Sequence, residues 1–85
     1  MIIKVSLKFE RSYRRLPTNI KEKAKEKECV FRKNLFDPRL KTHKLSGKDK
    51  KCWAFRIDNS YRIKFIFLSR QEVLFLDIGT HAIYK

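Results

Sequence analysis

Glycine, cysteine and acidic residues are scarce in this sequence. With only two glycines among its 85 residues it has neither a phosphate-cradling glycine loop nor a nucleophile elbow, since both motifs need several glycines at fixed spacing. Its two cysteines, Cys29 and Cys52, make no disulfide framework, and we expect both to be buried, reduced thiols. Apolar runs such as residues 65–68 are far too short to span a bilayer, and the N-terminus begins like a strand rather than a signal peptide. These absences favour a cytoplasmic protein.

Positive charge is what the chain has in excess. Its 22 Lys and Arg residues against 9 Asp and Glu give a formal net charge of +13. In a chain this short, that density indicates a polyanionic or acidic partner rather than a neutral metabolite. The length allows one domain, residues 1–85, and no repeat, low-complexity tract or linker marks a second.

Basic residues concentrate between positions 39 and 51, where Asp49 is the single acid. The six cations are Arg39, Lys41, Lys44, Lys48, Lys50 and Lys51. Any one of these fits an ordinary solvated loop, but together they indicate a track for nucleic-acid phosphates. Gly47 marks a turn after a short extended piece at residues 43–45.

The first third of the chain predicts one strand and two helices. Strand-like alternation with polar residues is seen at Ile3, Val5 and Leu7. Helical spacing follows at Phe9, Tyr13 and Leu16, and again at Ile20, Ala24, Phe31 and Leu35. Pro17 ends the first helix, Thr18 is the expected N-cap of the second, and Asp37-Pro38 ends that second helix. The Lys and Glu run over residues 21–28 is most simply a solvated face.

Residues 52–58, 61–68 and 73–79 alternate as three neighbouring antiparallel strands. A three-residue hairpin loop at residues 58–60 makes one face of the first pair wholly apolar. It pairs Trp53 with Phe65, Phe55 with Ile63 and Ile57 with Tyr61. A two-residue loop would mix both faces, and such a one-residue slip is disfavoured wherever one face is buried. Continued across a turn at residues 69–72, the apolar face pairs Phe67, Phe65 and Ile63 with Leu74, Leu76 and Ile78.

The opposite face of the predicted sheet is cationic. It sets Arg56 against Arg62, and like charges in a ladder destabilise it unless an anion bridges them. Lys64 falls beside Asp77, which fits a weak surface ion pair. Gly79 falls beside Arg62 and leaves room for a ligand, and His81 follows at the same parity if the chain stays extended. Phosphate would be a suitable bridging anion.

Strand, helix, helix and three antiparallel strands predict an α+β fold in which the N-terminal strand completes a twisted antiparallel sheet. The most specific motifs are His43-Lys44-Leu45-Ser46-Gly47, Tyr61-Arg62-Ile63 and Ile78-Gly79-Thr80-His81. In this order they resemble, over essentially the whole chain, the RelE/StbE (RelE/ParE) superfamily of bacterial toxins, and its YafQ-like branch of mRNA interferases most of all. The resemblance implies an endoribonuclease that enters the ribosomal A site, cuts mRNA, and is held inactive by an acidic cognate antitoxin through which the complex binds operator DNA.

The resemblance also implies site residues. Arg62 matches the arginine that contacts the scissile phosphate, His81 matches a C-terminal catalytic histidine, and His43 matches a second histidine of the YafQ-like branch. Tyr84 resembles an aromatic residue that stacks on or activates the substrate. Arg56 stands where that branch can carry histidine.

The chemistry of RNA cleavage suits these residue types independently. Without a metal, the 2'-hydroxyl attacks the adjacent phosphorus, so a base, a cation for the developing charge and an acid for the departing 5'-oxygen are needed. Histidine titrates near neutral pH, which makes His81 a candidate acid or base and His43 its complement. Arg62 is the candidate electrostatic stabiliser, and Arg56 helps to neutralise the substrate together with Lys64. No His, Cys and carboxylate cluster has ligand spacing, so we expect no metal or other cofactor.

Two other readings remain open at this point. A ParE-like toxin would act on DNA gyrase without RNA chemistry, although His81 in the tail argues against it. A plain basic RNA- or ribosome-binding module would carry its histidines incidentally. Tyr84 is equally compatible with stacking on an unpaired base and with docking onto the core of its own fold.

Overall fold

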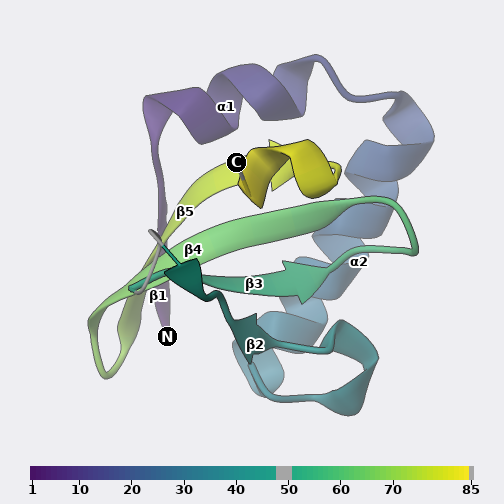
Figure 1. Cartoon of the computed structure of the whole chain (residues 1–85). Coiled ribbons are helices and arrows are strands. Elements are labelled where there is room, and N and C mark those ends of the chain that lie inside the picture. The colour runs from purple at the N-terminus through teal and green to yellow at the C-terminus, as the bar shows by residue number, and fades with distance from the viewer. Residues whose placement is uncertain (48–50, 85) are drawn as a thin grey trace.

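The computed structural model describes residues 1–47 and 51–84 (Figure 1). Its elements are β1 (Ile2–Val5), α1 (Leu7–Arg14), α2 (Thr18–Lys33), the short 3₁₀ helix η1 (Pro38–Leu40), β2 (His43–Lys44), β3 (Trp53–Arg56), β4 (Arg62–Ser69), β5 (Glu72–Gly79) and a second 3₁₀ helix, η3 (His81–Tyr84). Within these residues, neither α-helix combines the length and the apolar character needed to cross a membrane.

The strands form one five-stranded sheet in the order β1-β5-β4-β3-β2. Strands β3, β4 and β5 make the expected antiparallel meander, and β2 adds a short antiparallel edge. The α+β class is therefore confirmed. One detail differs, because β1 runs parallel to β5 and the sheet is mixed. The two helices between β1 and the meander provide the long crossover that a parallel pair requires.

The core lies between α2 and one face of the sheet, centred on Phe31. The Phe31 ring lies 4.7 Å from Phe55, 5.2 Å from Phe65 and 5.6 Å from Phe75, measured between centroids. These separations are typical of favourable aromatic pairs. All four rings are buried, and losing one would cost about 3–5 kcal/mol. The helical stripe predicted for α2 thus packs on the apolar sheet face, and in Figure 1 the helix lies behind the strands.

The β3–β4 register is the predicted one, whereas β4–β5 differs by a bulge. Trp53, Phe55 and Arg56 lie opposite Phe65, Ile63 and Arg62. On β5, Phe65 and Phe67 lie opposite Phe75 and Val73 rather than the expected Leu76 and Leu74, while Ile63 does lie opposite Ile78. The register shifts between Lys64 and Phe65, which leaves Leu76 as the extra residue. This bulge lets Phe75 enter the core while Asp77 stays on the opposite face beside Lys64.

Ser6 lies between β1 and α1 and is the N-cap of the helix. The predicted strand over residues 3–7 is therefore wrong in its second half. The Ser6 hydroxyl accepts a hydrogen bond from Phe9 N at 3.0 Å and donates one to Leu76 O at 2.8 Å. A serine with this bonding is a favourable N-cap, which draws Leu7 into the helix. Leu7 and Val5 are consequently exposed, and only Ile3 of the alternating residues packs against the core.

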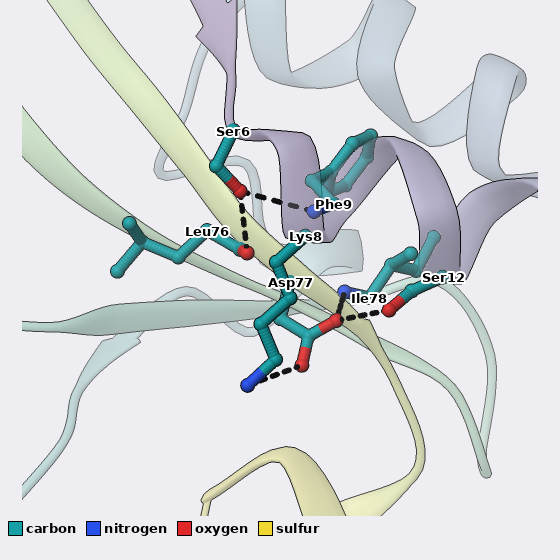
Figure 2. A network of polar contacts seen from close by, with 7 residues as sticks. All are labelled: Ser6, Lys8, Phe9, Ser12, Leu76, Asp77 and Ile78. Carbon is teal, nitrogen blue, oxygen red and sulfur yellow. Dashed lines mark hydrogen bonds and ion pairs between the residues drawn. The ribbon is translucent and has the colours of Figure 1, made fainter.

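Asp77 fastens α1 to the second half of β5 (Figure 2). Ser12 Oγ donates a hydrogen bond to Asp77 Oδ1 at 2.7 Å, and Ile78 N donates one to the same oxygen at 2.9 Å. Lys8 Nζ lies 3.6 Å from Asp77 Oδ2. These contacts compensate the burial of the carboxylate and hold β5 immediately before Gly79.

The ends of α2 also differ from the sequence-based expectation. Pro17 is the N-cap and Thr18 the first helical residue, because the Pro17 carbonyl accepts the first bonds of the helix. The helix ends at Lys33 rather than at Asp37-Pro38, since Asn34 is extended. Asp37 instead caps η1 through Arg39 N.

The two cysteines differ in exposure. Cys29 is exposed on α2, contrary to the expectation of two buried thiols, whereas Cys52 is buried at the start of β3. Neither forms a disulfide.

Candidate functional site

Two rows of residues cross the sheet face opposite α2. The strand register places His43, Ala54, Lys64 and Asp77 in one row, and Arg56, Arg62 and Gly79 in the next. Residues directly paired in a ladder share a face of the sheet. The predicted charged face is therefore present, and β2 adds His43 to it.

The chain does not stay extended beyond Gly79 but turns back as η3, in front of the strands in Figure 1. This turn, rather than strand parity, brings His81 to Arg62. Arg62 Nη2 lies 2.8 Å from His81 Nε2. A guanidinium can only donate, so Nε2 accepts the hydrogen bond and the ring proton of neutral His81 is on Nδ1.

Tyr84, at the end of η3, lies between the two histidines. Its ring centroid is 5.3 Å from that of His81 and 6.4 Å from that of His43, and both pairs meet edge to face. The His43 ring is also held from β2's own side of the chain, since its Nδ1 lies 3.0 Å from Lys41 O. Residues separated by about forty positions in the sequence are thereby gathered around one aromatic ring.

The hydroxyl of Tyr84 is buried and makes no hydrogen bond within the part of the chain that the structure describes. Burial raises the pKa of Tyr84 above its ordinary value, and the positive charges of Arg62 and Arg56 oppose part of this shift. Arg62 approaches the hydroxyl, although no donor and acceptor pair between them meets hydrogen-bond geometry. At neutral pH the phenol is protonated and can act as a proton donor.

Arg62 is buried, with 6 % of its surface exposed. Apart from His81, its Nη2 reaches only Asn59 O, at 3.5 Å, and its Nε has no hydrogen-bond partner among the described residues. Neither Arg62 nor the half-buried Arg56 opposite it forms an ion pair with a carboxylate of residues 1–47 or 51–84. Burying a charge is costly unless it is paired, so this pair of arginines favours an incoming anion.

The hairpin loop before Arg62 is held by Asp58. Its Oδ1 accepts hydrogen bonds from Ser60 N at 2.8 Å and Tyr61 N at 2.7 Å, and Lys23 Nζ lies 3.6 Å from Oδ2. Partial burial would raise the pKa of Asp58, but the two backbone bonds and Lys23 together lower it below its ordinary value. An aspartate with this bonding fixes a turn locally, and here it sets where β4 begins.

The space expected beside Gly79 is not open to a ligand. A Cβ atom at this position would lie 2.7 Å from Ile83 Cγ2, so η3 itself fills the space. The sequence reasoning missed Ile83. The available signal was a large aliphatic residue four positions after a glycine.

The basic residues predicted to bind RNA differ in exposure. Lys41, Lys44 and Lys51 are exposed, and Lys64 is half-buried in the row of His43. Lys48 and Lys50 lie outside the described residues. Lys41 has a left-handed backbone conformation with φ of 49°, which shapes the turn between η1 and β2.

No group of three or more His, Cys, Asp or Glu side chains is placed to hold a metal ion within residues 1–47 and 51–84. The side chains gathered in the site are two arginines, two histidines and a phenol. This set can bind an anion, donate protons and accept protons, which is the inventory that phosphate-ester chemistry requires.

The fold is that of RelE-type toxins, as similarity to solved structures shows. The YoeB/ParE toxin from Agrobacterium tumefaciens has a TM-score of 0.78 at 20% identity, with 95% of this chain and 99% of that chain covered. YafQ from E. coli strain BL21(DE3) has a TM-score of 0.78 at 19% identity, covering 95% and 93%. The E. coli DinJ-YafQ toxin-antitoxin complex contains a chain with a TM-score of 0.70 at 20% identity, covering 95% and 92%. No protein-family model and no curated protein sequence matches this chain. The resemblance drawn from the sequence motifs is thus confirmed at the level of the fold.

Proposed function

We propose that this protein is the toxin of a toxin-antitoxin module and acts as a ribosome-dependent mRNA endoribonuclease. It binds a phosphate of single-stranded mRNA at Arg62 and Arg56. The neighbouring ribose 2'-hydroxyl then attacks the phosphorus, and the bond from phosphorus to the 5'-oxygen breaks. Cleavage of mRNA in the ribosomal A site would stop translation. The fold shared with YafQ and YoeB supports this assignment.

The observation that carries the proposal is the buried Arg62, which has no carboxylate partner among the described residues and touches His81 instead. An arginine needed only for structure would be expected to have an acid to neutralise it. A guanidinium next to an imidazole can stabilise the negative charge that develops on a phosphate while the imidazole transfers a proton.

Each residue has a defined role in this mechanism. Arg62 and Arg56 stabilise the charge that develops on the phosphate oxygens. His43, exposed and on the far side of Tyr84, is the candidate base for the 2'-hydroxyl. His81 and the protonated phenol of Tyr84 are the candidate donors to the departing 5'-oxygen. The leaving strand would carry a 5'-hydroxyl and the other a 2',3'-cyclic phosphate.

The partner of the proposed toxin is an acidic antitoxin. A net charge of +13 favours fast association with a protein of opposite charge. One fold neighbour is a chain of the E. coli DinJ-YafQ toxin-antitoxin complex. We expect a small acidic protein to be encoded beside this gene and its addition to quench cleavage and raise the melting temperature.

The decisive experiment maps mRNA ends after the protein is added to translating ribosomes. We expect new ends only on ribosome-bound message, with cleavage reduced about 10²- to 10⁴-fold for His81→Ala. Arg62→Met should also lose cleavage, and Arg70→Met is its matched control, because Arg70 loses the same charge from an exposed position at the β4–β5 turn.

Other results would point away from a nuclease. Loss of gyrase supercoiling without cleavage would identify a gyrase poison, and ribosome binding without either activity would leave a binding module. Normal cleavage by folded His81→Ala protein would remove His81 from the mechanism.

A further inference from the structure

Gly79 and Ile83 form a close contact at the point where η3 leaves the sheet. Gly79 is the last residue of β5 and lies opposite Arg62 in the ladder. A methyl group added at Gly79 would come within 2.7 Å of Ile83 Cγ2, well inside van der Waals contact. Ile83 is thus seated on the bare backbone of residue 79.

This seat determines where the catalytic candidates of η3 lie. The helix has only four residues, and Ile83 N bonds back to Thr80 O at 3.0 Å, so a shift of Ile83 must move the whole turn. His81 and Tyr84 flank Ile83 in that turn. Their contacts with Arg62 and His43 depend on η3 lying close to β5.

We propose that Gly79 and Ile83 are positioning residues, whose close fit sets the His81 imidazole on Arg62 and the Tyr84 ring between the two histidines. The catalytic part of this inference rests on the proposed nuclease function, whereas its geometric part does not. A displacement of about 1 Å at catalytic groups can cost roughly 10²-fold in rate.

Backbone strain is not the reason for glycine here. Gly47, not Gly79, has a positive φ, so alanine can adopt the backbone conformation of residue 79. The conflict is with Ile83 Cγ2 alone. That atom is bonded directly to Cβ of a β-branched residue, whose χ1 is stiff, so it cannot swing away as the end of a long side chain could.

These facts define a set of variants with opposite expectations. Gly79→Ala should displace η3. The double variant Gly79→Ala/Ile83→Leu removes the Cγ2 branch while keeping the apolar volume, and it should restore the close packing of residue 83 on residue 79. The double variant Gly79→Ala/Ile83→Val keeps both γ-carbons and should not restore this packing. Val73→Ala is the control for lost stability, because Val73 is buried in the same strand but six residues from Gly79.

The first measurement is the tautomer of His81, read from its imidazole nitrogen signals by NMR at a pH where the ring is neutral. In the parent protein the contact with Arg62 holds the proton on Nδ1. We expect Gly79→Ala to lose this preference, the Leu double variant to regain it, and Val73→Ala to keep it. The second measurement is mRNA cleavage per folded molecule, which should fall about 10²-fold and recover in the same pattern.

The alternatives are distinguishable by these two readouts. A parent-like tautomer in Gly79→Ala, or equal recovery with leucine and valine, would overturn the positioning role. If the parent protein cuts no RNA, the proposed function fails while the tautomer series still decides the inference. Should Gly79→Ala not fold, Ile83→Ala removes the seat from the other side, and an unchanged His81 tautomer in that variant would equally refute the proposal.

Discussion

Replacing the buried guanidinium of Arg62 by methionine should separate stability from function. Arg62 is buried, with 6 % of its surface exposed, and it has no carboxylate partner among the described residues. Methionine fills a similar volume without the charge. We therefore expect Arg62→Met to fold at least as stably as the parent protein and to lose phosphate binding and cleavage.

The magnitude follows from the contacts that change. Removing the like-charged pair of Arg56 and Arg62 returns about 0.2–1 kcal/mol. The lost hydrogen bond to His81 costs little, because His81 is exposed and its Nε2 can bond water instead. Replacing a buried charge that has no carboxylate partner among the described residues also relieves its desolvation, so the free energy of unfolding should stay constant or rise, by up to about 4 kcal/mol.

Thermal unfolding with and without inorganic phosphate provides the assay. At phosphate concentrations of about ten times Kd, linkage stabilises the parent protein by roughly 1.4 kcal/mol. For a domain of this size that corresponds to a rise of about 6–11 °C in Tm. Arg62→Met should show none of this site-specific rise, while Arg70→Met, which loses the same charge from an exposed position, should keep it. The control also accounts for the general stabilising effect of phosphate.

The reasoning would be refuted by the opposite pattern. If Arg62→Met lost several kcal/mol of stability and still responded to phosphate like the parent protein, the arginine would be structural. The anion would then bind elsewhere on the basic surface.

Three further predictions concern Tyr84, Asp58 and Ser12. Tyr84→Phe should leave the free energy of unfolding unchanged or raise it by up to about 1–3 kcal/mol, because its buried hydroxyl has no hydrogen-bond partner among the described residues. It should lower cleavage about 10²-fold if the phenol donates a proton, and equal rates would exclude that role. Since the pKa of Asp58 is below its ordinary value of 3.8, its charge stabilises the fold above about pH 4, and this contribution is lost as the pH falls through the folded-state pKa. Urea unfolding of Asp58→Asn should therefore show a deficit in the free energy of unfolding at pH 7 that narrows as the pH falls below 3.8, and a constant deficit would contradict the assignment. Ser12→Ala should lower the free energy of unfolding by about 1.5–3 kcal/mol by removing the bond to buried Asp77, as measured by urea unfolding, and a smaller loss would indicate that water replaces the hydroxyl.

The hairpin between β3 and β4 shows how much periodicity can predict. Alternation at Phe55 and Ile63 determines which face is buried, and the three-residue loop follows because any slip would expose that face. The same logic correctly places Arg56 opposite Arg62. On β5 it fails by one residue, because Val73, Leu74, Phe75 and Leu76 are all apolar and alternation cannot tell which of them enter the core. Packing against Phe31 selects Phe75, and a bulge absorbs the difference.

The candidate site was accessible to sequence reasoning only in part. Motif resemblance identified Arg62, His81, His43 and Tyr84, and the structure brings all four together. The expectation that β5 continues as an extended chain to His81 was wrong, because the chain turns into η3 at this point. A segment of four residues such as His81–Tyr84 is too short to show a periodic pattern of apolar residues, so its conformation cannot be predicted from periodicity. Its position depends on contacts with residues distant in the sequence.

By itself, the sequence determined the composition-dependent properties of this protein: its positive charge, its α+β fold class, the helical stripe of α2, the apolar and cationic faces of the meander, and the hairpin register. These depend on local periodicity and on charge, which neighbouring residues encode. Only the tertiary structure decided that β1 runs parallel to β5, that a bulge at Leu76 lets Phe75 enter the core, and that Ile83 packs on Gly79 and so brings His81 onto Arg62. Each of these is a choice among partners far apart in the chain, made by packing and by the pairing of buried polar groups, and no local pattern records it.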